Sequence, residues 1–258
     1  MKAVILAGGL GTRLSEETDI RPKPMVEIGG KPILWHIMKI YSTYGINDFI
    51  ICLGYKGYLI KDYFYHYKLH NSDITVDQRE NKTIIHNSYC EPWKITLVDT
   101  GEQTLTGGRL KRVKEYIGKE TFCFTYGDCL CDVDISKIIY FHENMRSEGA
   151  LVTLLAIRPF GRYGAIDLED NMVKRFIEKP EQDTNYVNGG YFVLEPDVID
   201  YIDDDMTSWE LEPIEKLSRE GHVRAYKHHG FWGAMDTLRE KRSLEKMWNN
   251  GNAPWKKW

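Results

Sequence analysis

A glycine-rich segment near the first residue has the composition of a phosphate-binding loop. An apolar run over residues 3–7 predicts a buried strand, and it leads into residues 8–13, Gly-Gly-Leu-Gly-Thr-Arg. Glycines let main-chain N–H groups approach an anion, while Thr12 and Arg13 donate side-chain hydrogens to phosphate oxygens. Lys23, which stands between two prolines, adds a second cation in a stiff segment. We therefore expect a polyphosphate site here; a solvated turn between a strand and a helix is the alternative.

The segment fits neither of the two common phosphate loops. The dinucleotide pattern Gly-x-Gly-x-x-Gly does not match Gly8, Gly9 and Gly11. The P-loop pattern is missing too, because the Gly-Gly-Lys run at residues 29–31 is followed by Pro32 in place of Ser or Thr. A different class of nucleotide-binding protein is indicated.

Two carboxylates are candidates for holding a metal ion. Asp128 follows the apolar run 121–126, and Asp236 follows the apolar run 231–235. A carboxylate at the end of a buried strand needs a cation or hydrogen-bond donors to offset its loss of hydration. Two carboxylates beside a polyphosphate suit Mg²⁺, so we expect Mg²⁺ as cofactor. The alternative is that each caps the next element, as Asp236 would before Thr237.

A second glycine-rich segment, residues 104–112, reads Thr-Leu-Thr-Gly-Gly-Arg-Leu-Lys-Arg. Main-chain N–H groups at the start of its predicted helix can contact an anion or the edge of a base. Thr106 is therefore a candidate for base or ribose recognition, together with main-chain groups of residues 6–8 and 106–108. An ordinary capped helix with a basic exposed face is the alternative.

Two further segments carry polar groups suited to a sugar phosphate. In Phe-Ile-Glu-Lys-Pro, residues 176–180, Glu178 can accept hydrogen bonds from sugar hydroxyls and Lys179 can hold a phosphate. Asn188, before Gly-Gly and a predicted strand, offers an amide at the rim of a pocket. In isolation, an exposed ion pair and a plain turn explain them equally well.

Cys129 and Cys131 flank Leu130 and stand beside two aspartates, which raises a thiolate–carboxylate metal site as an alternative use. A third and a fourth ligand at zinc spacing are missing from the sequence, and residues 228–229, His-His, lack ligand spacing as well. We therefore expect these cysteines to be small buried side chains.

The elements that must position these residues alternate between strands and helices. This order predicts an α/β fold with a mostly parallel, doubly wound, Rossmann-like sheet, whose ligands lie at the carboxyl ends of the strands. The loops at residues 8–13 and 127–128 both follow predicted strands and can meet at that edge. The predicted strands are 3–7, 48–53, 95–98, 121–126 and 150–157, and the predicted helices are 33–44, 58–69, 108–116, 135–146 and 238–248.

The second half of the chain predicts a smaller antiparallel part. Short strand candidates at 165–168, 172–177 and 191–194 suggest a β appendage over the active-site edge. With no proline- or serine-rich linker, we expect a single domain over 1–258. In it, roughly residues 150–236 provide the sugar-binding part and 237–258 form a helical, aromatic tail.

Composition excludes several functional classes. The 258 residues carry a net charge of −4, so no basic field favours nucleic acid. The apolar stretch at residues 3–7 is too short for a signal peptide, and no run approaches the ~18 residues of a membrane span. Five scattered cysteines fit a reduced, cytoplasmic protein better than a disulfide framework.

Nearly the whole chain resembles the sugar-1-phosphate nucleotidyltransferases, and within them the glucose-1-phosphate cytidylyltransferases. The loop at residues 8–13 and Glu-Lys-Pro at 178–180 are shared by the wider superfamily, whereas Thr-Gly-Gly-Arg-Leu at 106–110 and the tryptophan-rich end look specific to the cytidylyl branch. The resemblance is carried by residues 1–13, 21–36, 91–93, 97–101, 106–110, 125–128, 178–180, 188–190, 235–239 and 253–256.

This resemblance implies a reaction of CTP with α-D-glucose 1-phosphate that gives CDP-glucose for surface-polysaccharide synthesis. It also implies Mg²⁺, a homo-oligomer and an aromatic tail that contacts another subunit. The implied catalytic residues are Arg13, Lys23 and Asp128; the nucleotide-binding residues are Leu6, Ala7, Gly8, Gly9, Gly11, Thr12, Arg13, Lys23, Thr104, Thr106, Gly108 and Arg109; the sugar-phosphate residues are Gly164, Glu178, Lys179 and Asn188; and the metal ligands are Asp128 and Asp236.

The chain departs from the family pattern at two places. Gly-Asp-Cys stands at residues 127–129 where the family usually has Gly-Asp-Gly, and Phe-Trp-Gly-Ala-Met-Asp stands at 231–236 in place of Phe-Trp-Gln-Pro-Met-Asp. Both changes adjoin the proposed metal carboxylates, so the acceptor sugar stays open. Another nucleotide such as UTP or dTTP, or a non-catalytic nucleotide-sensing subunit, are the rival readings.

Overall fold

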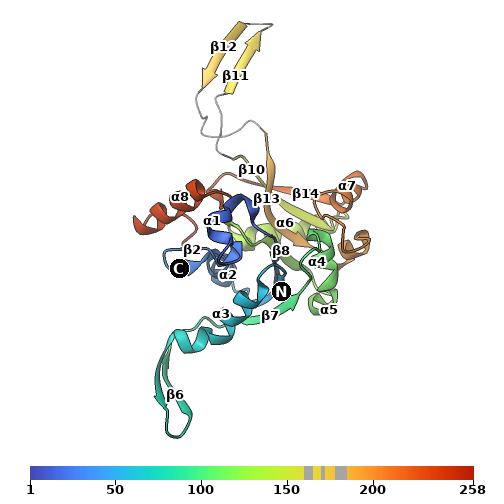
Figure 1. Cartoon of the computed structure of the whole chain (residues 1–258). Helices are drawn as coiled ribbons and strands as arrows, with labels where there is room; N and C mark the ends of the chain where they lie inside the picture. The colour runs from blue at the N-terminus through green and yellow to red at the C-terminus, as the bar shows by residue number, and fades with distance from the viewer. Residues whose placement is uncertain (160–164, 170–171, 178–184) are drawn as a thin grey trace.

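A seven-stranded sheet forms the centre of the computed structural model, which describes residues 1–159, 165–169, 172–177 and 185–258 (Figure 1). The strand order is β14-β10-β13-β8-β1-β4-β7. In sequence order these strands are β1 (Lys2–Ala7), β4 (Asp48–Leu53), β7 (Lys94–Asp99), β8 (Phe122–Tyr126), β10 (Val152–Ile157), β13 (Val187–Leu194) and β14 (Val223–His228).

The sheet is parallel except for one strand. β1 pairs in parallel with β4 and β8, β4 with β7, and β10 with β14. β13 runs antiparallel to both of its neighbours, β8 and β10. The other six strands therefore point the same way, and their carboxyl ends share one edge of the sheet.

The placement of β13 corrects the prediction that residues 191–194 belong to an antiparallel appendage. The strand lies in the middle of the main sheet and begins at Val187, so Asn188 lies within it and not in a turn before it. Its glycines, Gly189 and Gly190, are buried. Because glycines and an asparagine give no strand pattern, the sequence did not show this half of the strand.

Helices cover both faces of the sheet, which confirms the doubly wound α/β prediction. Side chains of β1 alternate between two hydrophobic clusters, with Ile5 in the first and Val4 in the second. The first cluster also takes side chains from α2 (Ile33–Thr43), α3 (Gly57–His70), α6 (Ile135–Arg146) and α8 (Leu238–Asn249). The second takes them from α4 (Thr106–Arg112), α5 (Lys114–Ile117), the 3₁₀ helix η3 (Pro196–Tyr201) and α7 (Glu212–Arg219).

The predicted helix over residues 108–116 is divided in two. α4 ends at Arg112 and α5 starts at Lys114, with Val113 between them. Among the described residues, no helix is both long enough and apolar enough to cross a bilayer. The remaining short elements are α1 (Ser15–Thr18), the 3₁₀ helices η1 (Thr12–Leu14) and η2 (Lys23–Met25), and the strands β2 (Glu27–Ile28) and β3 (Lys31–Pro32).

Two hairpins project from the body (Figure 1). The predicted hairpin of β11 (Ala165–Glu169) and β12 (Met172–Ile177) is present, and it follows the carboxyl end of β10. The second hairpin, β5 (Ser72–Asp77) and β6 (Lys82–Ser88), was not predicted. All seven residues of β6 are exposed, and its two isoleucines are adjacent, so this strand shows no apolar alternation.

A short pair of strands away from the main sheet was also missed. β9 (Cys129–Cys131) pairs antiparallel with β15 (Trp232–Ala234), with Leu130 opposite Gly233. Strands of three residues are too short to show a period. This pair, called the β9–β15 ladder below, carries residues from two distant parts of the chain to one place.

The aromatic tail packs on its own chain. Trp255 is fully buried and its indole N–H donates to His36 Nδ1 at 3.5 Å, while the ring of Trp248 lies edge-on to the His36 ring at 4.7 Å. Trp255 is therefore covered by its own chain, and the expectation that the tail contacts another subunit stays a prediction. The indole ring is shielded from water by its own chain, so no second subunit is needed to bury it.

Candidate active site

A cavity of about 410 Å³ opens at the carboxyl ends of β1 and β8, and we call it the β1–β8 cavity. Most of the residues predicted to bind a nucleotide line it. They are Leu6, Ala7, Gly8, Gly9, Gly11, Thr12, Lys23, Thr104, Thr106 and Arg109, joined by Asp128. Five lining residues were not predicted: Pro24, Leu105, Tyr126, Gly127 and Glu210.

A larger surface hollow of about 880 Å³ lies elsewhere, over α3 and β7. It is lined mainly by aromatic and aliphatic side chains, including Tyr65 and Trp93, and by none of the predicted site residues. A ligand with several phosphates needs cations and N–H donors, so the β1–β8 cavity is the better candidate.

Arg109 holds the start of the glycine loop in place. Its guanidinium group donates to the carbonyl oxygens of Gly8 at 3.1 Å, Leu53 at 3.0 Å and Gly101 at 2.7 Å, and to the Thr100 hydroxyl at 2.9 Å. A Cβ on Gly8 would lie 2.1 Å from Arg109 Nη1, so only glycine permits this approach. Burial lowers the pKa of Arg109, and the residue is 4% exposed. The contacts give this predicted nucleotide-binding residue a positioning role at the cavity wall.

Lys23 lies between the two predicted metal carboxylates. Its Nζ atom is 2.6 Å from Asp128 Oδ2 and 2.6 Å from Asp236 Oδ1. Burial alone would lower the pKa of Lys23, but the charges and hydrogen bonds of Asp128 and Asp236 outweigh it and raise that pKa. The ammonium group is therefore charged at neutral pH and balances carboxylate charge at the cavity.

The β9–β15 ladder explains why these carboxylates converge. Asp128 precedes β9, and Asp236 stands two residues after the end of β15. The Met235 N–H donates to the Asp128 carbonyl at 2.9 Å and extends the pairing by one step. Antiparallel pairing thus brings two aspartates that are far apart in sequence to the same end of one ladder.

The alternative that Asp236 merely caps α8 does not hold. Thr237 is the residue that caps this helix, since its hydroxyl accepts from the Glu240 N–H and Glu240 returns a hydrogen bond in a capping box. Asp236 instead bonds Lys23. Two carboxylates that face one point beside a cavity are a donor set that fits Mg²⁺, which takes one or two carboxylates and fills its other positions with water and phosphate oxygens.

Thr106 and Glu210 begin a chain of polar contacts along the cavity wall. The Thr106 hydroxyl donates to Glu210 Oε2 at 2.6 Å and accepts from the Trp209 N–H at 2.9 Å. The hydroxyl of Tyr126 is also hydrogen-bonded to Glu210, and the Asn188 amide donates to that hydroxyl at 3.4 Å. Desolvation, followed by the Glu210 charge, raises the pKa of Tyr126.

This network joins a predicted nucleotide-binding residue to a predicted sugar-phosphate residue. Glu210 lies 104 positions after Thr106, and nothing in the local sequence around it suggests a site. The sequence could not show this pairing, because only the fold brings the segment before α7 next to the start of α4.

Some predicted residues do not line the cavity. Gly108 packs against the main chain of Asp205, where a Cβ would lie 2.5 Å from Asp205 Cα. Tight packing therefore explains why this residue is a glycine, and the predicted nucleotide contact does not. Gly164, Glu178, Lys179 and the side chain of Arg13 lie outside the described residues.

The chain belongs to the nucleotidyl transferase family, whose pattern matches residues 2–237. Within curated relatives, the chain is 58% identical to a glucose-1-phosphate cytidylyltransferase of Salmonella typhi, with all of both chains covered. A probable glucose-1-phosphate cytidylyltransferase of Bacillus subtilis is 46% identical over the full length of both.

Solved structures agree with this fold. The structure of HddC from Yersinia pseudotuberculosis superimposes with a TM-score of 0.69 at 26% identity, and the match covers 96% of this chain and 99% of HddC. A second structure of HddC, at a TM-score of 0.68 and 27% identity, is a complex with GMP-PN. The predicted resemblance to nucleotidyltransferases is therefore confirmed.

Proposed function

We propose that this protein transfers a cytidylyl group from CTP to α-D-glucose 1-phosphate and releases pyrophosphate, giving CDP-glucose. The observation that carries the proposal is the convergence of the glycine loop, Lys23 and Asp128 on one cavity, with Asp236 bonded to Lys23 beside it. Full-length identity of 58% to a glucose-1-phosphate cytidylyltransferase supports the choice of both substrates.

The reaction is an in-line displacement at phosphorus. A phosphate oxygen of the sugar 1-phosphate forms a bond to the α-phosphorus of CTP while the bond to the departing pyrophosphate breaks. The attacking oxygen is already an anion, so no strong general base is required. Catalysis then consists of placing two anions in line and stabilising the charge that develops.

The residues at the cavity divide these tasks. Main-chain N–H groups of the loop from Gly8 to Gly11 would bind the triphosphate, assisted by Arg13. One Mg²⁺ held by Asp128 and Asp236 would offset negative charge on the triphosphate and the leaving group. Lys23 keeps the two carboxylates together, and we infer that its ammonium contacts phosphate oxygens once a cation occupies them.

The sugar phosphate would lie on the Asn188 side of the cavity. Asn188 contacts Tyr126, which lines the cavity next to Gly127 and Asp128. The roles of Gly164, Glu178 and Lys179 as sugar-phosphate ligands stay predictions, as do the homo-oligomer, the cytoplasmic location and the single domain. Asn188 and Thr106 are linked through Tyr126 and Glu210, so their positions depend on the same network.

Base selection requires polar groups in fixed positions. Cytosine and uracil differ in their exocyclic group and in whether ring N3 accepts or donates a hydrogen bond. A buried group left unpaired by the wrong base costs about 1–3 kcal/mol, so two mismatches give a factor of hundreds or more. The firmly bonded Thr106–Glu210 pair and the ordered main chain at Leu6–Gly8 provide such positions.

Pyrophosphate release separates the candidate functions. With Mg²⁺ and a panel of sugar 1-phosphates, we expect kcat/KM for CTP with α-D-glucose 1-phosphate to exceed that for UTP or dTTP at least about 100-fold. Comparable values across nucleotides would refute the cytidylyl choice and leave the transferase reaction standing. Nucleotide binding without any pyrophosphate release would instead identify a sensing subunit.

A further inference from the structure

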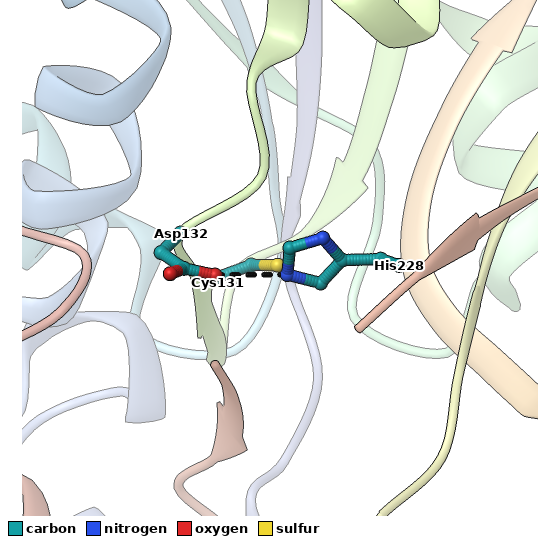
Figure 2. Close-up of side chains that lie close together, drawn as sticks. All are labelled: Cys131, Asp132 and His228. Atoms are coloured by element: carbon teal, nitrogen blue, oxygen red, sulfur yellow. Dashed lines mark hydrogen bonds and ion pairs between the residues drawn. The ribbon is translucent and has the colours of Figure 1, made fainter. Parts of the chain in front are cut away.

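The β9–β15 ladder has a second cluster of metal-ligating side chains at its end away from Lys23. Cys131 Sγ, an Asp132 carboxylate oxygen and a His228 ring nitrogen lie within 4.8 Å of one another. Figure 2 shows the three side chains close together. His228 Nε2 is 2.8 Å from Asp132 Oδ1. Cys131 ends β9 and Asp132 follows it, whereas His228 ends β14. We propose that this cluster is a structural zinc site, separate from the proposed Mg²⁺ site.

The chemistry of the three ligands favours Zn²⁺. Thiolate, imidazole and carboxylate are the donors that Zn²⁺ takes in proteins, whereas Mg²⁺ prefers oxygen alone. Zinc bonds of 2.0–2.3 Å at tetrahedral angles place ligand atoms about 3.3–3.8 Å apart. In the cluster one pair of ligand atoms is 2.8 Å apart and all three atoms lie within 4.8 Å of one another, so a small separation of Asp132 from His228 would admit the ion. One water molecule would complete the four ligands.

Cys131 would bind the metal as a thiolate. The side chain is fully buried, and burial raises the pKa of its thiol. The thiolate is the form that binds a metal, and the positive charge of the ion would stabilise it in this buried position. Zinc binding would release the thiol proton to solvent.

The loop that joins β14 to β15 is shaped to let His228 and Asp132 meet. A Cβ on Gly230 would lie 2.3 Å from Asp132 Oδ1 and 2.7 Å from His228 Cε1. The Phe231 carbonyl accepts from the Asp132 N–H at 3.1 Å and fixes the same corner. The side chains of Asp132 and His228 are 21% and 12% exposed, so an ion can reach them from solvent.

One cation already stands near the cluster. Lys257 Nζ is 4.0 Å from Asp132 Oδ2, the carboxylate oxygen that does not face His228. Because Lys257 faces Oδ2, the other carboxylate oxygen, Oδ1, is the one directed toward the other two ligands. The lysine would balance charge on the bound carboxylate in the way that groups behind a ligand commonly do.

A metal here would anchor the ladder that carries Asp128. Asp132 lies four positions after Asp128, which corresponds to about 13 Å along an extended chain. Zn²⁺ would join the end of β9 to the end of β14, a strand of the main sheet. Its effect would therefore be on stability and on the position of the ladder, with no contact to substrate.

The test measures zinc binding in the presence of Mg²⁺. Purified protein kept in a non-thiol reductant is equilibrated with Zn²⁺ and excess Mg²⁺, and retained zinc and the melting temperature are measured. We expect one zinc per chain and a rise in Tm of several degrees. Co²⁺ in place of Zn²⁺ should give the absorption of a cobalt–thiolate bond.

Matched variants locate the ion. Cys131→Ala and His228→Gln should each weaken zinc binding about 100-fold or more, because even the loss of a group that only orients a ligand costs about 10- to 100-fold. Cys90→Ser and His229→Gln remove the same residue types outside the cluster and should retain zinc. Zinc binding that survives Cys131→Ala, or no binding by the unmodified protein, would overturn the proposal. Loss in Cys131→Ala with retention in Cys90→Ser supports it even if His228→Gln fails to fold.

Discussion

The two ends of the β9–β15 ladder carry similar side chains in different surroundings. At one end, Asp128 and Asp236 share the ammonium of Lys23 beside an open cavity. At the other end, Asp132 meets His228 next to a fully buried thiol and a glycine corner. The first arrangement leaves room for ligands, whereas the second joins strands.

This difference shows how three-residue strands can hold a reactive pair of carboxylates. Isolated two-stranded pairs of this length are barely stable in water. Here the ladder is tied to the main sheet through His228 at the end of β14 and packs through Leu130 on the core cluster. We expect variants at the cavity end to lose activity and variants at the tied end to lose stability.

The largest contrast should come from one substitution made at each end. Asp128→Asn should lower kcat about 10³-fold, because charge stabilisation by a bound metal is worth several kcal/mol. Asp132→Asn should keep kcat within about tenfold at saturating Mg²⁺. Steady-state pyrophosphate release measures both, and circular dichroism shows whether both variants fold. Equal losses at the two ends would contradict the division.

Lys23→Ala sharpens the comparison at the cavity end. We expect kcat to fall about 10²-fold with a smaller change in the KM for CTP, since the ammonium would act on charge that builds in the transition state. The variant also leaves Asp128 and Asp236 facing each other without their cation, and like charges repel. Mg²⁺ should therefore raise its Tm more than that of the unmodified protein.

Lys94→Ala is the control for that experiment, because its partner Asp48 lies in an exposed ion pair far from the cavity. An exposed pair contributes about 0–1 kcal/mol, so its Tm should respond to Mg²⁺ as the unmodified protein does. A Lys23→Ala variant with a higher KM and an unchanged kcat would show that Lys23 contributes equally to ground-state and transition-state binding.

The stability of the protein in acid tests a third site, His36, which is a buried titratable group with no opposite charge beside it among the described residues. Burial lowers the pKa of His36 to about 4, below its ordinary value of 6.5, and its hydrogen bond to the Ile28 carbonyl only partly opposes this. The unfolded chain therefore binds more protons between these pH values. The free energy of unfolding should fall by about 3 kcal/mol as pH drops from 6.5 to 4.

Urea unfolding at several pH values measures that slope. His36→Gln keeps a donor for the Ile28 carbonyl and cannot titrate, so its slope over the same range should be shallower by this amount. An identical slope in both proteins would assign the acid sensitivity to other groups, such as His142, whose pKa burial also lowers.

The smallest effect is expected from the polar network at the cavity wall. Glu210→Gln keeps the shape of the side chain but weakens the bonds from Thr106, Ser208 and Tyr126. Hydrogen bonds to a charged group contribute about 1.5–3 kcal/mol, and part of this survives with glutamine, so kcat/KM should fall about tenfold. Glu212→Gln, an exposed neighbour at the start of α7, is the matched control and should be neutral.

Sequence reasoning succeeded where the signal is local. The glycine loop, Lys23 and the strands and helices of the first half carry their chemistry or their burial pattern within a few residues. It failed where contacts are distant: His228 lies 96 positions after Asp132, and the histidine pair gave no ligand spacing. It also failed where burial is absent, as in β5 and β6, and where glycines interrupt a central strand, as in β13.

The contact between Trp255 and His36 has a consequence for how the protein is made. The two residues are 219 positions apart. At about 5–20 residues per second, a ribosome that has just added His36 needs about 10–45 s more to reach Trp255. During that time α2 is present without the indole that covers its histidine, and the nascent chain exposes an aromatic surface around Trp35 and His36. Translation speed and chaperone supply should therefore affect the yield of folded protein more than they affect its final stability.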